Sequence, residues 1–129
     1  MHKNFIAIGA LLAALAVALG AFGAHGLKKI DSEDVVQAFQ TGVQYQMYHS
    51  LALILTGILV EKFPSKLTLH ACRFFITGII LFSGSLYLLT AFKAFGIEHL
   101  NFVGIITPLG GIFFIIGWGY LFFSCLKNK

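Results

Sequence analysis

The stretch from Gly20 to Leu27 reads GAFGAHGL and closes the first long apolar run of the chain. That run, Phe5 to Phe22, has 18 residues. As an α-helix it would be about 27 Å long, close to the ~30 Å of hydrocarbon in a bilayer. It is also longer than the core of a secretory signal, so we expect an uncleaved membrane span. GAFGAHGL then places three glycines and a histidine where the first span meets water.

The composition of the whole chain agrees with a membrane protein. Of its 129 residues, 58% are hydrophobic and only 11% are charged, whereas soluble domains have about 25% charged residues. So short a chain could not hide this much apolar surface in a soluble core. The net charge of +4 comes from basic residues at the ends of apolar runs. Because they form no basic patch with aromatic residues, no nucleic-acid partner is expected.

The apolar runs predict a single membrane domain, residues 1–129, with spans at about residues 4–23, 43–62, 69–92 and 102–126. In the second span the fully apolar part, Leu51 to Val60, has 10 residues, too few to cross a bilayer. This span must therefore begin near Gly42 and take polar residues into the membrane. Residues 32–42 before it are amphipathic. They either lie along the interface and turn near Gly42, which we favour, or extend the span as one unbroken helix.

The predicted fold class is an all-α membrane protein, a four-transmembrane-helix bundle with an amphipathic segment before the second span. Small residues recur at three-, four- and seven-residue intervals within the spans. Such spacing allows helices to approach closely in lipid. The glycines predicted to pack between helices are Gly9, Gly20, Gly23, Gly57, Gly78, Gly84, Gly104, Gly111 and Gly117.

Four spans place both termini on the same side of the membrane. Six basic residues would lie on that side and three on the other: Lys3, Lys62, Lys66, Arg73, Lys127 and Lys129 against Lys28, Lys29 and Lys93. Because basic residues are enriched on the cytoplasmic side, we expect a multi-pass protein of the cell (inner) membrane with both termini in the cytoplasm.

A candidate polar site is predicted from the few polar residues within or beside the spans. Tyr45 to Ser50 (YQMYHS) opens the second span, and we expect His49 to lie at the depth of His25, near the outer face. FSGSLY and TPLGG add hydroxyl groups in the middle of the third and fourth spans. The glutamines could face a polar pocket or water. The candidate residues are His25, Gln44, Tyr45, His49, Ser83, Ser85 and Thr107.

Motifs of known catalytic or metal-binding sites are not found in the sequence. It has no GxSxG, HExxH or phosphate-binding loop, and no carboxylate in the middle of a span. Cys72 and Cys125 form no CxxC pair. We therefore expect no catalytic residue, no metal site and no cofactor.

Several segments together resemble one family: GAFGAHGLK, YQMYHSLAL, LFSGSLYLL, TPLGG and GW. It is the YgdD/YwdK-type family of small bacterial inner-membrane proteins of unknown function. The resemblance covers nearly the whole chain and implies a four-span inner-membrane protein. It implies no activity, so no functional residue is carried over.

Three hypotheses for function follow. We favour a non-enzymatic membrane protein that acts through helix–helix or lipid contacts, with membrane lipid, further copies of itself or another membrane protein as partners. The second is a small-solute or ion pathway lined by the candidate polar residues. The third is a redox or cofactor protein that uses His25 and His49 as ligands.

Overall fold

The computed structural model describes residues 3–27, 33–96 and 103–127, and all regular structure in these ranges is helical. The elements are α1 (Lys3–Gly26), α2 (Glu33–Lys62), α3 (Lys66–Gly78), the π-helix η2 (Ile79–Ser83), α4 (Gly84–Ala94) and α5 (Val103–Lys127). Since α3, η2 and α4 follow one another without a gap, they form one span. In the described part of the chain, four helices are thus long and apolar enough to cross a membrane. The expected all-helical membrane fold is confirmed.

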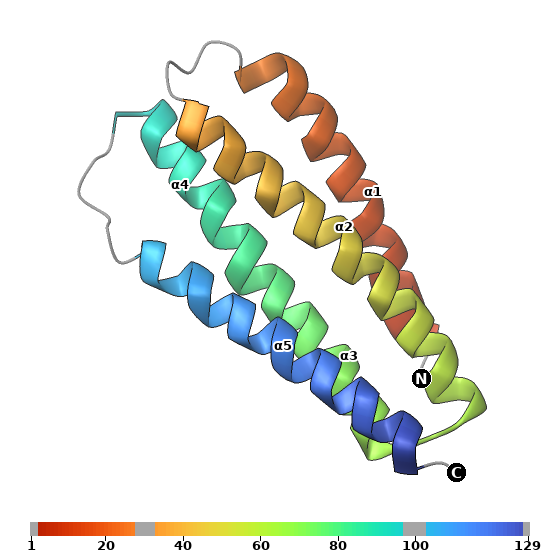
Figure 1. Cartoon of the computed structure of the whole chain (residues 1–129). Helices are drawn as coiled ribbons and strands as arrows, with labels where there is room; N and C mark the ends of the chain where they lie inside the picture. The colour runs from red at the N-terminus through yellow and green to blue at the C-terminus, as the bar shows by residue number, and fades with distance from the viewer. Residues whose placement is uncertain (1–2, 28–32, 97–102, 128–129) are drawn as a thin grey trace.

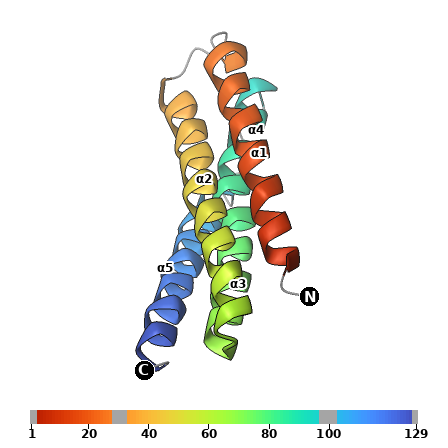
Figure 2. The same ribbon diagram turned by 90° about the vertical axis from the view of Figure 1, so that its right-hand side faces the viewer.

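The four spans pack in the order α1, α2, third span, α5. The main partner of α1 is α2, while the third span contacts both α2 and α5. The two views in Figures 1 and 2 show the helices running roughly side by side, with both chain ends at the same end of the bundle. The short connection between α2 and α3 lies at that end too. Both termini therefore share one side, as four spans require.

The second span differs from the favoured expectation. We expected residues 32–42 to lie along the interface and turn near Gly42, but α2 is one helix from Glu33 to Lys62. The prediction of a turn near Gly42 is therefore wrong, and the amphipathic segment extends the second span as part of the same helix. Gly42 is buried against the third span: a Cβ atom there would lie 3.1 Å from the ring of Tyr87 and 3.3 Å from Leu86. Close packing against the third span explains why residue 42 is a glycine, and the helix does not bend there.

The π-helix η2 sits at the centre of the third span and faces α5. A π-turn adds one residue to a helical turn and is frequently found at functional sites. Gly110 of α5 lies directly against it, because a Cβ atom at Gly110 would overlap the backbone nitrogen of Phe82 and lie 2.8 Å from its Cα atom. Because Gly110 has no side chain, α5 can pack directly against the wider π-helical turn of the third span.

Many of the predicted packing glycines do lie between helices. A Cβ atom would come within 3.0 Å of a side chain on another helix at five of them: Gly9, Gly23, Gly57, Gly78 and Gly117. At Gly20 and Gly111 the contact would be an ordinary one. The prediction is wrong for Gly84 and Gly104, which have nothing within 4 Å. Seven-residue spacing places glycines on one helix face, but it cannot tell which face a neighbour covers.

The third span ends just before Gly96, the one glycine with a positive φ angle among the described residues. Gly96 has φ 72°, and its backbone N–H donates to the carbonyl of Lys93. At the other end of that span Ser65 caps α3 by accepting from the N–H of Leu67. Lys28, Lys29 and Lys129, which entered the charge count above, lie outside the described residues.

Candidate functional site

His49 lies in the interior of the bundle with both ring nitrogens hydrogen-bonded. The side chain is only 5% exposed. Its Nδ1 atom is 2.8 Å from the carbonyl oxygen of Tyr45, one turn earlier in α2. Its Nε2 atom accepts from the indole N–H of Trp118 on α5 at 3.1 Å. Because an indole can only donate, Nε2 must accept, and the proton of neutral His49 must be on Nδ1.

Aromatic rings surround this histidine. Its imidazole stacks on the ring of Phe114 at 3.6 Å with an interplanar angle of 9°. Phe75 approaches from the third span with its ring centre 5.7 Å away. A second proton on His49 would be on Nε2, where it would point at the indole N–H of Trp118, which is also a donor. Only the neutral ring can therefore bond both to the carbonyl of Tyr45 and to Trp118. The arrangement fixes the histidine in one state and links α2 to α5.

Gln46, one turn before His49, connects three helices. Its amide nitrogen donates to the carbonyl of Leu12 on α1 at 2.7 Å. Its amide oxygen accepts from the hydroxyl of Tyr87 on α4 at 2.6 Å. Gln46 is 3% exposed, so both bonds are shielded from water. Gln46 therefore serves as a polar bridge between α1, α2 and the third span.

The hydroxyl groups of the third span bond to the neighbouring spans. Ser83, fully buried in η2, donates to the carbonyl of Gly42 on α2 at 2.6 Å. Ser85 is hydrogen-bonded to Thr107 on α5, and its hydroxyl is also 2.8 Å from the carbonyl of Phe82. The three predicted hydroxyl groups thus lie between helices, and each already has a partner.

Two of the candidate residues lie apart from these contacts. His25 is exposed on the last turn of α1. A Cβ atom at Gly9 would lie 3.0 Å from the carbonyl of Ser50, which puts His49 near the level of Gly9. The helix from Gly9 to His25 rises about 24 Å. The expected equal depth of His25 and His49 is therefore wrong, and the two cannot bind one metal or haem.

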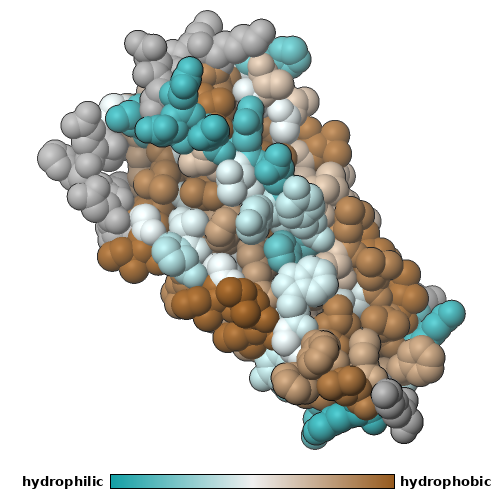
Figure 3. Space-filling model, viewed as in Figure 1, coloured by the Kyte–Doolittle hydropathy of each residue, from teal (hydrophilic) through white to brown (hydrophobic). Residues whose placement is uncertain are grey.

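Gln44 is the other candidate that faces outward. It is exposed and lines a shallow pocket of about 150 Å³ with Gly20, Phe39, Gln40 and Val43. Tyr45 is 38% exposed and stacks on Phe82 of η2, with ring centres 4.7 Å apart. In Figure 3 hydrophilic residues gather at both ends of this face, and a paler band follows the first half of α2, whereas the second half of that helix is hydrophobic. The exposed polar residues of α2 belong to that surface.

The chemistry that the interior can support follows from these bonds. Within the described residues, every buried side-chain nitrogen or oxygen has a hydrogen-bond partner. No group of three His, Cys, Asp or Glu side chains in those same ranges could hold a metal ion. The solute-pathway hypothesis needs a polar lining that is free to meet a solute. The buried hydroxyl and amide groups among the described residues are instead hydrogen-bonded to the helices themselves.

Three residues of this site were not among the sequence candidates. They are Gln46, Tyr87 and Trp118. A sequence signal existed for two of them, because Trp118 is the single tryptophan of the chain and Gln46 stands one turn before His49. Tyr87 gave no such signal, since a tyrosine in a span is usually an interfacial residue. Its role depends on the register between α2 and α4.

The single tryptophan makes the His49 contact measurable. His49→Leu removes the acceptor of the Trp118 N–H, so we expect the Trp118 emission to move to shorter wavelength. It should also lower the free energy of unfolding by about 1 kcal/mol, the scale of interhelical hydrogen bonds in membranes. Fluorescence of the protein in detergent measures the first effect. Tyr48→Leu, at an exposed neighbouring position, is the control; equal spectra for wild type and His49→Leu would contradict the contact.

Fold and site together define a small polytopic helical membrane protein whose polar interior is hydrogen-bonded between its spans. Comparison with known proteins gives its family. Residues 19–111 match the family described as "Protein of unknown function (DUF423)". The chain belongs to this family, which confirms the resemblance drawn from its motifs. No solved structure matches it significantly.

Relatives from several bacteria match the chain over almost its full length. UPF0382 membrane protein YwdK of Bacillus subtilis is 42% identical over 97% of this chain and 98% of its own. A UPF0382 membrane protein of Haemophilus influenzae is 39% identical over 100% of this chain and 98% of its own. A Staphylococcus aureus relative, SAB0533, is 41% identical over 97% of both chains. All are named as membrane proteins, and none of these names states an activity.

Proposed function

We propose that this protein is a non-enzymatic integral membrane protein that acts through contacts of its helices with lipid and with other membrane helices. The observation that carries the proposal is the state of the polar interior. His49, Gln46 and Ser83 each donate or accept across to another helix. Polar groups that are used in this way stabilise an arrangement of spans. They offer no free nucleophile, acid or base to a substrate.

The outer helices support the same proposal. α1 contacts mainly α2, and most of its apolar surface faces outward; Leu11 is 61% and Val17 62% exposed. On α5 the side chains of Ile105 and Ile115 are 74% and 72% exposed. In a membrane such faces are covered by lipid chains or by neighbouring helices. The molecule therefore presents its surroundings with two broad apolar faces and a fixed core.

Liposome flux separates this proposal from the pathway hypothesis. Purified protein reconstituted into vesicles loaded with a pH-sensitive dye, or with a potassium indicator, should give the leak of empty vesicles. Ser83→Ala and Thr107→Ala should not change that leak. A flux well above that of empty vesicles, lost in either variant, would contradict the proposal and favour a pathway through the third and fourth spans.

We also propose that the termini lie in the cytoplasm, in the inner membrane where a cell has two. Support comes from charge: Lys62, Lys66, Arg73 and Lys127 lie toward the end of the bundle that holds the termini. Towards the opposite end the structure describes Lys93 together with two acidic residues, Glu33 and Asp34. Basic residues favour the cytoplasmic side, while acidic ones have little effect.

Reporter fusions test this orientation. A fluorescent protein fused after Lys129 should be bright, since green fluorescent protein folds in the cytoplasm. Alkaline phosphatase at the same position should be inactive because it needs export. The same two reporters inserted between residues 97 and 102 should give the opposite pattern. Active phosphatase at the C-terminus would contradict cytoplasmic termini.

A further inference from the structure

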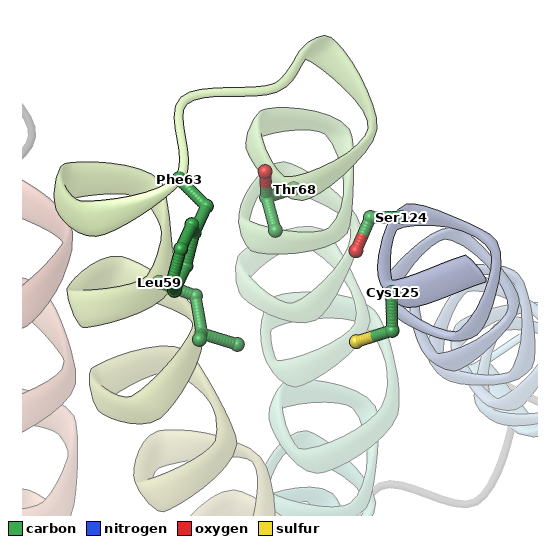
Figure 4. A pocket seen from close by; sticks show the side chains of 5 residues that line it. All are labelled: Leu59, Phe63, Thr68, Ser124 and Cys125. Carbon is green, nitrogen blue, oxygen red and sulfur yellow. The ribbon is translucent and has the colours of Figure 1, made fainter. Parts of the chain in front are cut away.

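A half-open pocket of about 230 Å³ lies at the end of the bundle that holds the termini. Its walls come from three helices, as Figure 4 shows: Leu59 of α2 with the adjoining Phe63, Thr68 of α3, and Ser124 with Cys125 of α5. The α2 and α5 residues face each other across the pocket, and Thr68 lies between them. The pocket is thus a gap between the ends of α2 and α5 that the third span closes from behind.

The walls of this pocket suit hydrocarbon. Leu59 and Phe63 offer only carbon, and the exposed Cys125 directs its sulfur toward the pocket. The two hydroxyl groups are already bonded to their own helices, Thr68 to the carbonyl of Ser65 at 3.0 Å and Ser124 to the carbonyl of Leu121 at 2.7 Å. An occupant would therefore find no polar group waiting for a partner.

The size of the pocket limits its occupant. Sites for drug-sized ligands have about 300–1,000 Å³, and an engineered cavity of about 150 Å³ holds one benzene. A pocket of about 230 Å³ therefore admits a flexible segment of one hydrocarbon chain but not a complete ring cofactor. In a bilayer the available molecule with such a chain is a lipid.

Positive charge flanks the pocket on each of its three walls. Lys62 directly precedes Phe63, Lys66 lies two positions before Thr68, and Lys127 lies two positions after Cys125. All three lysines are exposed at helix ends. Glu61 is the one acidic residue among the described residues of this end. Lysines near a membrane surface attract anionic lipids, each by roughly fivefold in affinity.

We propose that this pocket holds an acyl-chain segment of an anionic phospholipid, whose phosphate lies among Lys62, Lys66 and Lys127. The apolar walls select a chain, the volume limits it to one, and the lysines select the charge of the head group. The inference deepens the proposed function and rests on it, since it names the lipid that one of those contacts would bind. Zwitterionic lipids lack the net charge that the lysines would recognise.

Native mass spectrometry with paired lipids tests the proposal. Delipidated protein is mixed with phosphatidylglycerol and phosphatidylcholine of identical acyl chains, and the bound adducts are counted. We expect one lipid per chain, with phosphatidylglycerol preferred by roughly tenfold or more. Cys125→Phe fills the pocket and should lower this retention about tenfold, an effect on the scale of one buried aromatic group. Leu126→Phe, the exposed neighbour outside the pocket, should retain lipid like wild type.

A charge variant tests the head-group site independently of the walls. Lys62→Gln, Lys66→Gln and Lys127→Gln combined should keep the bound lipid but lose the preference for phosphatidylglycerol. Lys93→Gln, at the opposite end, should keep it. Trp118 remains the single tryptophan in all these variants, so its emission reports whether each has folded. Equal retention of both lipids by wild type, or full retention by folded Cys125→Phe, would overturn the proposal. Neither result would touch the proposed function, which only a flux or a bound cofactor contradicts.

Discussion

Gly110→Ala is expected to destabilise the protein more than any other single-methyl change, by ~3 kcal/mol or more of unfolding free energy. The new Cβ atom would overlap the backbone nitrogen of Phe82 and lie 2.8 Å from its Cα atom. A flexible side chain could move aside, but the backbone of η2 is held by its own hydrogen bonds. α5 and the third span would have to separate. The midpoint of unfolding in mixed micelles of dodecyl maltoside and SDS measures the loss.

Gly119→Ala is the matched control for this change. It lies in the same helix, and a Cβ atom there would meet nothing within 4 Å. Alanine replaces glycine in a helix at a gain of up to about 1 kcal/mol, so the control should be neutral or slightly stabilising. Similar midpoints for the two variants would mean that α5 does not press against the π-turn.

Gln46→Ala should lower the unfolding free energy by about 2–3 kcal/mol. It removes two bonds between helices, one to the carbonyl of Leu12 and one from the hydroxyl of Tyr87. Such bonds are worth about 0.6 kcal/mol on average and up to 1.7 each in a membrane, and the cavity left by a buried side chain adds to their loss. The same micelle titration measures this change.

Gln44→Ala provides the comparison, because it truncates an exposed glutamine of the same helix and should cost little. Tyr87→Phe removes only one of the two bonds and should cost about 1 kcal/mol. If Gln46 and Tyr87 interact as described, the double variant costs less than the sum of the single ones. Exact additivity of Gln46→Ala and Tyr87→Phe would show that their contact contributes nothing.

Much of the fold could be predicted because hydrophobic length is a direct physical signal in membranes. α1, the third span and α5 agree with the predicted spans to within a few residues at either end. α2 was less predictable because its apolar run is short. His49 was therefore expected near the outer face, and the glutamines were expected to face either a polar pocket or water. In the structure Gln46 and His49 are buried and bond to neighbouring helices. These polar residues lie inside the bundle because other helices cover them, and hydropathy does not measure burial by protein.

Several residues of the candidate site could be predicted from the sequence, but the contacts between them could not. His49 was identified, yet its expected neighbour was His25 and its actual neighbour is Trp118. Which residues meet depends on the depth of each along its helix, and α2 extends well beyond the apolar run that set the estimate. The π-turn was equally hidden, because it depends on one additional residue per turn in the backbone and leaves no periodic signature.

The most direct test of a non-enzymatic role is a native mass spectrum of the protein released gently from its own membrane. The expected spectrum shows the bare chain, further copies of it, or chains carrying only phospholipid, from a colourless preparation. A haem, metal ion or quinone bound near one per chain, and lost from a folded His49→Ala variant, would contradict it. That result would make the histidine a ligand and the protein a redox or cofactor protein.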